Sequence, residues 1–513
     1  MDIEIIKGGS QSPLLLFLNF AVSTEFRNFV HFFERMKYLF GFFFALVLTC
    51  MPNFCLAQEE RLSSDTIVYY WVANQGIDIH KNNQVKLLKS GEEKFTDMFE
   101  TIRNAKKSVH LEYFNFRNDS IANALFNLLS VKVKQGVRVR ALYDAFGNMS
   151  NNRPLKKRHV NAIRNLGIEL FKWDPVVFPW VNHIFPRDHR KIVIVDDKVA
   201  YTGGMNVADY YVVGLPKIGQ WRDMHVRIEG SAVKDLQGAF LDSWEKETKQ
   251  DLRNYDYKQP AKIQPINAQD SLILHLKGTP KEWNNAVHLM DLKLRKDAKE
   301  QGEYRAGPIN QATDENGNII PLHPLLESKV NNASVAVLDR VPKKSPKIMR
   351  VFYSVSLDAA NERVLLINPY FAPTHKVKKA LKRAIDRGVD VQIMIPSKSD
   401  IPFTPDAAYN EVNKLRKRGA TVYLYDGGFH HSKIMMVDDK FCTVGSTNLD
   451  SRSLRYDYEL NVVIFDKSTT GELVTMFEND VKDSRLLTDE VWKERSWWRK
   501  FVGKIASMLS FCL

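Results

Sequence analysis

The chain has 513 residues, of which 73 are Lys or Arg and 60 are Asp or Glu, so its formal net charge is +13. With 44% hydrophobic and 26% charged residues, a disordered, collagen-like or polytopic membrane chain is excluded, and a globular body with a sizeable core is expected. The positive excess predicts an anionic partner, for which nucleic acid, a phospholipid surface and phosphorylated substrates all qualify.

The N-terminal part of the chain has the pattern of a targeting segment. Met36 is flanked by Arg35 and Lys37, an apolar run covers 39–48, and small residues close the segment at Ala57. A basic start, a short apolar stretch and small residues at the cleavage position are typical of a signal peptide. Counted from Met36 the segment is 22 residues long, a normal signal length, so Met36 is the expected start.

Two other interpretations of this segment stay open. It could be an uncleaved anchor, because residues 38–56 approach the ~20 that span a bilayer, although Pro52 and Asn53 interrupt the run. It could also be a buried core helix, although nothing amphipathic breaks the run. If the segment meets a membrane, its basic residues stay inside and the body lies on the outer, periplasmic face.

Comparison of the chain with itself shows one unit written twice. Three strand-like strings recur, which are 109–116 with 364–371, 136–142 with 388–394, and 167–171 with 419–423. The offset is 252 residues both from Gly136 to Gly388 and from Gly167 to Gly419. Helical patterns precede the last two strings of each half, over 121–135, 160–166, 377–387 and 408–418. Alternating strands and helices predict an α/β fold of two pseudo-twofold-related sandwich lobes, with the active site between them.

These patterns divide the chain into five expected parts. They are an N-terminal extension with signal peptide or anchor (1–57), an N-terminal lobe (58–255), a connecting insertion (256–347), a C-terminal lobe (348–485) and an amphipathic tail (486–513). The insertion is polar and contains several prolines, and a short helix is expected in it around 283–299.

A polar element of identical spacing, H-x-K-x4-D-x6-G-[GS]-x-N, occurs once in each half. The first copy contains His189, Lys191, Asp196 and Asn206, and the second contains His431, Lys433, Asp438 and Asn448. On a strand, residues i and i+2 point to the same face, so each histidine and its lysine converge on one site. Two copies meeting about a pseudo-twofold axis would surround one phosphodiester with two imidazoles and two ammonium groups.

That set of groups suits in-line displacement at phosphorus. Such a reaction needs a nucleophile, a proton donor and cations near the equatorial oxygens, and the set supplies each without a metal or cofactor. The four scattered cysteines and the Cys/His spacing also indicate no zinc site and no disulfide framework. The candidate catalytic set is therefore the two copies of His, Lys and Asp.

Four carboxylates in and near the motifs have different expected roles. Asp196 and Asp438 each begin an Asp-Asp-Lys turn at the far end of the strand, where a structural hydrogen-bond or ion-pair role is favoured. A reacting imidazole needs its other ring nitrogen held by an acceptor, and Asp223 and Glu459 are the candidates for orienting the histidines. A surface salt bridge is the alternative for that second pair.

At these residues the chain resembles the phospholipase D superfamily and, within it, the bacterial cardiolipin synthases. The two H-x-K elements (HKD motifs) are specific for the superfamily. The likeness extends from about Val85 to Leu513 apart from the insertion. The strings that narrow it to the synthases are 188–197, 201–206, 221–225, 368–373 and 445–453, with Leu-Thr-x-x-x-Trp at 487–492.

The resemblance implies that one histidine attacks a phosphatidylglycerol phosphodiester, releases glycerol and forms a phosphatidyl-histidine (phosphohistidine) intermediate. The free hydroxyl of a second phosphatidylglycerol then attacks, which gives cardiolipin. By analogy His189 is the nucleophile and His431 the acid/base, whereas pseudo-symmetry leaves the reverse assignment open. The residues that map onto phosphate-binding positions are Lys191, Lys433, Asn206 and Asn448.

The tail carries apolar residues at helical spacing behind Trp497 and Trp498. Their partners on this face are Phe501, Val502, Ile505, Met508, Leu509 and Cys512, while Arg499, Lys500, Lys504 and Ser507 occupy the other. This composition is expected of a helix that lies in a bilayer interface, and a terminal helix docked on the body is the alternative.

The expected function is thus a membrane-bound transferase of the cardiolipin synthase type. The expected partners are phosphatidylglycerol and an anionic membrane surface, and the protein is expected to be a monomer. Nucleic acid is not expected, because no aromatic-basic strip typical of single-strand binding is present. Two alternatives are an exported phospholipase D or nuclease that uses water as acceptor, and a catalytically silent lipid-binding protein.

Overall fold

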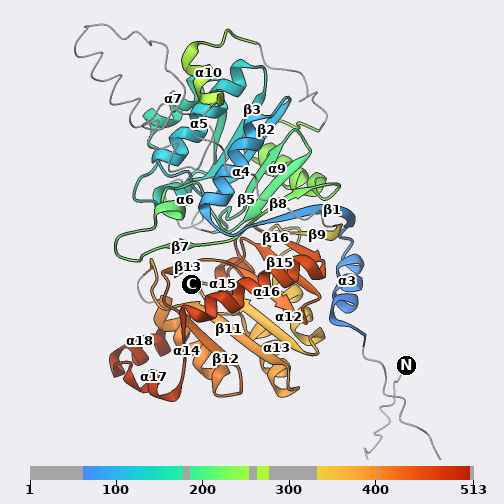
Figure 1. The fold of residues 1–513 in the computed structure, drawn as a ribbon, viewed down its shortest axis with the longest axis vertical. Helices are drawn as coiled ribbons and strands as arrows, with labels where there is room; N and C mark the ends of the chain where they lie inside the picture. The colour runs from blue at the N-terminus through green and yellow to red at the C-terminus, as the bar shows by residue number, and fades with distance from the viewer. Residues whose placement is uncertain (1–61, 177–184, 254–262, 276–331, 402–403, 509–513) are drawn as a thin grey trace, which may run out of the picture. The chain divides into compact units, whose positions relative to one another are not determined.

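A single 15-stranded mixed sheet runs through the structure, a computed structural model that describes residues 62–176, 185–253, 263–275, 332–401 and 404–508 (Figure 1). Ser63–Leu513 form one unit, separate from Met1–Leu62. The predicted extension 1–57, its expected start at Met36 and the helix expected around 283–299 lie outside the described residues. Among the helices of the described ranges, none is long and apolar enough to cross a membrane.

The sheet consists of two corresponding series of strands that meet at its middle. Outward through the N-terminal lobe run β1 (Ile79–Leu88), β8 (His225–Glu229), β6 (Val199–Gly203), β5 (Lys191–Val195), β2 (Ser108–Tyr113), β3 (Arg138–Asp144) and β4 (Glu169–Trp173). Outward through the C-terminal lobe run β9 (Ala333–Arg340), β16 (Glu459–Phe465), β15 (Phe441–Gly445), β14 (Ile434–Val437), β10 (Arg363–Ile367), β11 (Asp390–Pro396), β12 (Thr421–Tyr425) and β17 (Ser484–Leu486).

Taken position by position, the first seven strands of the two series correspond, and β17 extends the second. The predicted fold class, α/β with two pseudo-twofold-related lobes, is confirmed. The two lobes share one sheet, because β1 and β9 pair antiparallel, with Ile79 opposite Ala336 and His80 opposite Val335. Strand β9 lies within 256–347, so the last part of the predicted insertion belongs to the sheet.

The repeated strings correspond to parallel strands joined by helical crossovers. Parallel neighbours need such crossovers, and they are α5 (Ser120–Lys134), α7 (Lys157–Asn165), α13 (His375–Asp386) and α14 (Thr404–Arg416). The glycines at offset 252 follow the ends of these helices. Gly136 and Gly388 have φ of +87° and +84°, a left-handed conformation in which glycine ends a helix without a steric penalty.

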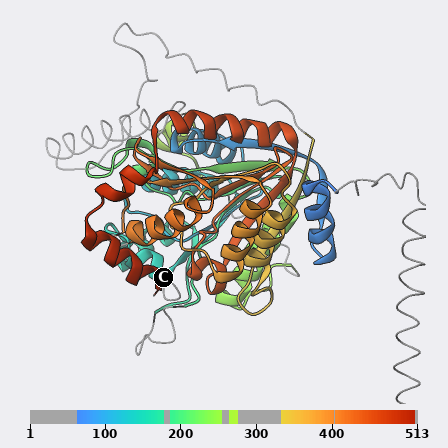
Figure 2. The ribbon, with the colours of Figure 1, turned by 90° about the horizontal axis from the view of Figure 1, so that it is seen from below.

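Further helices cover the sheet and complete the unit. They are α3 (Ser64–Asn74), α4 (Gly91–Arg103), α6 (Ala145–Met149), α8 (Tyr210–Val213), α9 (Val233–Thr248), α10 (Ala268–His275), α12 (Ile348–Ala359), α15 (Ser451–Arg455), α16 (Lys467–Lys482), α17 (Asp489–Glu494) and α18 (Trp497–Met508). Figure 2 shows α16 along one face of the C-terminal strands and the yellow and orange helices on the other.

In the part of the chain that the structure describes, three apolar clusters form the core. One lies under α4, α5 and α7 in the N-terminal lobe, and a second lies under α12, α13 and α14 in the C-terminal lobe. The third spans both lobes, where Phe240 and Trp244 of α9 and Leu473 and Phe477 of α16 pack on the opposite face of the sheet. Each such side chain contributes ~1.5–3 kcal/mol when fully buried, so the shared cluster holds the lobes together.

Candidate active site

A short strand of each lobe pairs with a short strand of the other lobe beside the motif histidines. Strand β7 (Trp221–Arg222) pairs in parallel with β13 (Phe429–His430), one strand from each lobe. The backbone N–H of His431 donates to the carbonyl of Arg222 at 2.6 Å. The residue after β7, Asp223, therefore lies next to the residue after β13, His431.

The same crossing occurs at the pseudo-symmetric position. Asp188 forms a parallel bridge with Tyr458, and the N–H of His189 donates to the carbonyl of Tyr458 at 3.0 Å. Glu459 follows Tyr458 and thus lies next to His189.

Each motif histidine is held by a carboxylate of the other lobe. Nδ1 of His189 lies 3.0 and 3.2 Å from the two carboxylate oxygens of Glu459, and Nδ1 of His431 lies 2.7 Å from Oδ2 of Asp223. Because a carboxylate only accepts, a hydrogen bond to it requires the proton on Nδ1 and leaves Nε2 with the lone pair that can react. The structure thus brings the predicted orienting residues to the histidines, as crossed pairs.

The motif lysines lie against the same histidines. Nζ of Lys191 donates to the carbonyl of His189 at 2.6 Å, and Nζ of Lys433 donates to the carbonyl of His431. Burial lowers the pKa of Lys191 to about 7 and that of Lys433 to about 8, against the opposing charges of Glu459 and Asp223. Their ammonium charge is therefore poised to change near neutral pH.

The titration of the paired groups differs between the two halves. Burial, followed by the charge of the neighbouring lysine, lowers the pKa of both His189 and His431. Burial also opposes ionisation of Asp223, but the charges of Lys433 and His431 outweigh it and hold its pKa below the ordinary value. Burial of Glu459 outweighs the charge of Lys191, so its pKa is raised.

One position of the motif differs between the copies, being Gly204 in the first and Ser446 in the second. Each of these residues lies next to one of the two orienting carboxylates. A Cβ at Gly204 would come within 2.2 Å of an Asp223 carboxylate oxygen, so glycine leaves room for Asp223. Ser446 instead donates its hydroxyl to Oε2 of Glu459. The two halves thus support their carboxylates by different means.

The side chains of the two motif asparagines are buried. Asn206 and Asn448 are 5% and 6% exposed. Within the described residues, neither side-chain oxygen has a hydrogen-bond partner. These two buried amide oxygens, at equivalent positions of the two motif copies, remain able to accept a hydrogen bond from a ligand.

Asp196 and Asp438 do not belong with the reacting groups. They lie at the opposite end of β5 and β14 from the histidines. The carboxylate of Asp196 accepts from the backbone N–H groups of 106–108 at 2.7–3.0 Å, and that of Asp438 from those of 361–363 at 2.8–3.0 Å. Their placement in the candidate catalytic set is corrected, because their oxygens fix the start of β2 and β10.

The histidine beside the second motif faces another partner. Nε2 of His430 lies 3.0 Å from Oδ2 of Asp480, which also binds Arg222. His430 is fully buried in β13. Successive side chains of an extended backbone point to opposite sides, so the side chain of His430 points away from the side on which His431 contacts Asp223.

The structure adds one residue to the site that was not predicted from the sequence, Lys94. Lys94 of α4 is fully buried and donates to the carbonyls of Met205 and Asn206 at 3.2 and 3.0 Å, so it supports the loop that carries Asn206. The sequence feature that indicates this burial is the position of Lys94 four residues before Met98, on the apolar face of α4.

Aromatic rings surround the two histidines. The ring of Phe114 lies 5.1 Å from that of His189, and Trp221 and Tyr370 lie 5.4 and 5.8 Å from His431, as centroid distances. These rings restrict the imidazoles to few orientations.

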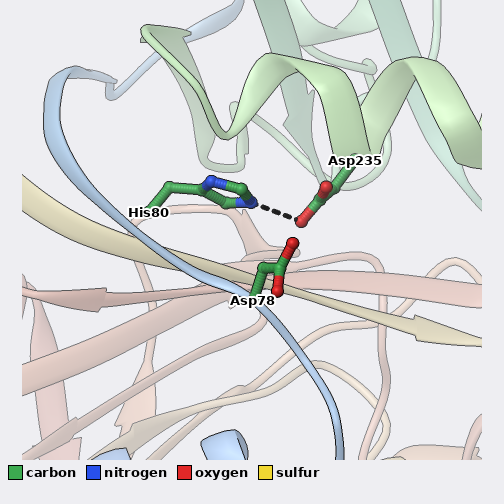
Figure 3. A group of neighbouring side chains, drawn as sticks. All are labelled: Asp78, His80 and Asp235. Atoms are coloured by element: carbon green, nitrogen blue, oxygen red, sulfur yellow. Dashed lines mark hydrogen bonds and ion pairs between the residues drawn. The ribbon is translucent and has the colours of Figure 1, made fainter.

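A second group of titratable side chains joins β1 to α9. Figure 3 shows His80 with its ring toward Asp235, at 2.7 Å from Nε2 to Oδ2, and Asp78 beside them. The three ligand atoms lie within 4.8 Å of one another, and Asp78 also lies 3.4 Å from Nζ of Lys234. Because each carboxylate already has a partner of this chain, we assign the group to the packing of α9 on β1.

Comparison with known proteins agrees with this architecture. The family model described as cardiolipin synthase, PLD-like domain, matches residues 98–244 and 354–481, more than half of the chain. A cardiolipin synthase of Listeria monocytogenes is 29% identical over 447 residues, covering 86% of this chain and 78% of its own. The major cardiolipin synthase ClsA of Bacillus subtilis is 29% identical over 459 residues, covering 89% and 81%.

A solved structure shares the fold. The phosphatidylserine synthase of Haemophilus influenzae superimposes with a TM-score of 0.57 at 15% identity, over 88% of this chain and 100% of its own. At that identity the likeness concerns the fold alone.

Proposed function

Because the chain belongs to the cardiolipin synthase family with phospholipase D-like domains, we propose that it joins two phosphatidylglycerol molecules into cardiolipin and glycerol. It is an enzyme, a phosphatidyltransferase of the phospholipase D superfamily. The observation that carries the proposal is the crossed pairing of His189 with Glu459 and of His431 with Asp223, which leaves both Nε2 atoms free to react.

In the first half of the reaction, Nε2 of His189 attacks phosphorus of one phosphatidylglycerol. The P–N bond forms as the P–O bond to the glycerol headgroup breaks, and His431 donates the proton that the departing oxygen needs. His431 gains that proton before the step, and Asp223 stabilises the imidazolium through Nδ1. The product is a phosphatidyl-histidine and free glycerol.

In the second half, a free glycerol hydroxyl of another phosphatidylglycerol attacks the same phosphorus. His431, now neutral, accepts the hydroxyl proton, the new P–O bond forms and the P–N bond to His189 breaks. Cardiolipin leaves, and both histidines return to their starting state. Lys191 and Lys433, with the amides of Asn206 and Asn448, hold the phosphate oxygens, on which negative charge increases in each transition state.

The proposal includes the setting of the enzyme. The N-terminal segment, as signal peptide or anchor, delivers the body to the outer face of the cell membrane, where it acts as a monomer on phosphatidylglycerol in an anionic surface. We further propose that the chain consists of the five parts predicted above, with β9 belonging to the sheet that both lobes share.

Mass spectrometry of the products tests the proposal. Purified protein is incubated with phosphatidylglycerol vesicles, and lipids and released glycerol are resolved over time. Cardiolipin and glycerol in equal amounts are expected. Phosphatidic acid without cardiolipin would show that water is the acceptor and would replace the synthase proposal with a phospholipase D.

A further inference from the structure

Helix α18 packs on α14 through its small side chains. Gly503 lies against the backbone of Asp406, where a Cβ would come within 2.4 Å of the carbonyl oxygen. Ser507 is buried, and its hydroxyl donates to Glu411 of α14. In Figure 1 α18 accordingly lies beside α14 in the C-terminal lobe.

Arg495, two positions before the first residue of the helix, fixes its position. Arg495 pairs with the carboxylate of Asp406, and its guanidinium carbon lies 3.9 Å from the centroid of the Tyr409 ring. An ion pair, a cation–π contact and a close backbone approach therefore hold one edge of α18 against the lobe. The helix cannot turn its large side chains inward without losing these contacts.

Large apolar side chains point away from the lobe. The outer face of α18, which we define as Trp497, Trp498, Phe501 and Ile505, has exposed fractions of 74%, 57%, 48% and 41%. The spacing i, i+1, i+4, i+8 places them on one arc of the helix. A helix docked only for stability buries its largest apolar side chains, and α18 does the reverse.

Basic residues border this arc. Lys504 and Arg499 are exposed, and Lys500 donates to the carbonyl of Lys493 at 3.0 Å. The combination of indole rings with lysine and arginine is suited to a bilayer interface, where the rings enter the headgroup region and the cations meet lipid phosphates. A second copy of the chain fits less well, because a symmetric contact would bring the basic borders together.

We propose that the outer face of α18 inserts into the interface of a membrane leaflet that contains anionic phospholipid. The insertion itself stands on the geometry of α18, and only the choice of phosphatidylglycerol as the anionic lipid rests on the proposed function.

The inserted helix lies next to a wall of the candidate active site. Asp406, which α18 contacts, lies in the first turn of α14. Six residues earlier in the chain, Asp400 accepts a hydrogen bond from the Tyr370 hydroxyl at 2.7 Å. The ring of Tyr370 lies 5.8 Å from that of His431. Insertion of α18 would therefore hold this side of the site close to the leaflet that supplies a lipid substrate.

Quenching of tryptophan fluorescence by lipid tests the insertion. Full-length protein is reconstituted in vesicles of phosphatidylglycerol and phosphatidylcholine, with acyl chains brominated close to the headgroup. None of the nine tryptophans lies in residues 1–61, so the quenching does not report the N-terminal segment. Wild type should show a quenched fraction that the double variant W497F/W498F loses, because phenylalanine keeps the apolar face without the indole emission.

Enzyme activity on vesicles and on dispersed lipid distinguishes a loss of membrane insertion from a loss of catalysis. The double variant W497S/W498S should lose at least about fivefold more activity on vesicles than on dispersed short-chain phosphatidylglycerol, whereas W497F/W498F should lose far less. Tyr70→Ser, at a ring 62% exposed on α3, is the matched control and should behave as wild type in both assays.

Two results would overturn the insertion. One is equal quenching of wild type and W497F/W498F. The other is light scattering that shows a dimer in wild type and a monomer in W497S/W498S, which would assign the face to a second copy. If no cardiolipin forms but quenching depends on the two indoles, the proposed function fails and the insertion stands.

Discussion

The imidazole of His431 and the carboxylate of Asp223 lie 2.7 Å apart although 208 residues separate them and each comes from a different lobe. His189 and Glu459 repeat this relationship at 3.0 Å. Each histidine is thus oriented only when the lobes are docked, because its acceptor is carried by the other lobe. The site is a property of the interface between the lobes, because neither lobe supplies the carboxylate that orients its own motif histidine.

Replacing either motif histidine should separate the two chemical roles. We expect His189→Asn and His431→Asn each to lower kcat by at least about 10³-fold, since each removes a reacting group. After reaction with labelled phosphatidylglycerol and quenching in alkaline denaturant, which preserves the P–N bond, a lipid-phosphate adduct should accumulate on the His431→Asn enzyme and be absent from the His189→Asn enzyme. The opposite pattern would reverse the two assignments.

His430→Asn is the matched control for these variants. His430 is a buried neighbour of His431 that binds Asp480, so its loss should reduce stability and leave kcat within about threefold of wild type. A loss as large as that of His431→Asn would mean that the doubled histidine takes part in the reaction.

The two orienting carboxylates should differ in their importance. Asp223→Asn is expected to lower kcat by about 10²–10³-fold with little change in KM, because the amide cannot stabilise the imidazolium of His431. Glu459→Gln should lose less, because burial raises the pKa of Glu459 and makes its charged form less favourable, whereas the pKa of Asp223 is lowered. Equal losses, or losses that appear only in KM, would argue against the positioning role.

The lysines predict how activity depends on pH. Burial holds the pKa of Lys191 at about 7 and that of Lys433 at about 8, so raising the pH through this range removes their positive charge. Phosphate binding needs that charge, and kcat/KM should therefore fall as pH rises above about 7 to 8.

Lys191→Arg checks this explanation, because a guanidinium stays protonated throughout. Its absolute activity falls, but its kcat/KM measured between about pH 6 and 9 should lose less of its value at the alkaline end. An unchanged alkaline limb in both Lys191→Arg and Lys433→Arg would assign the limb to another group.

The motif aspartates should affect stability and leave the chemistry unchanged. Asp196→Ala or Asp438→Ala removes the acceptor of three backbone N–H groups and should cost about 2–4 kcal/mol of unfolding free energy, measured by urea titration. Asp439→Ala is the control, because its exposed pair with Arg363 is worth at most about 1 kcal/mol. A large loss of kcat in the folded enzyme, at unchanged stability, would return the two aspartates to the catalytic set.

Much of the fold and of the candidate site can be predicted from the sequence alone, without knowledge of the tertiary contacts. The repeated strings correspond to strands β2, β3 and β4 and to β10, β11 and β12, because a buried strand and a crossover helix carry their own periodicities, and glycine at a helix end marks the boundary. The duplicated H-x-K spacing identified the histidines and lysines, since residues two apart on a strand share a face.

What only the tertiary structure decided involves residues far apart in the chain. No local pattern indicates that β7 pairs with β13, yet this pairing assigns Asp223 to His431 and leaves Glu459 for His189. Likewise, the amphipathic pattern of α18 predicts a helix but not which edge it buries. Close packing of Gly503 on Asp406 decides that edge and leaves the tryptophans exposed. Sequence periodicity determines which side chains share a face, whereas pairing and packing across the fold determine what that face meets.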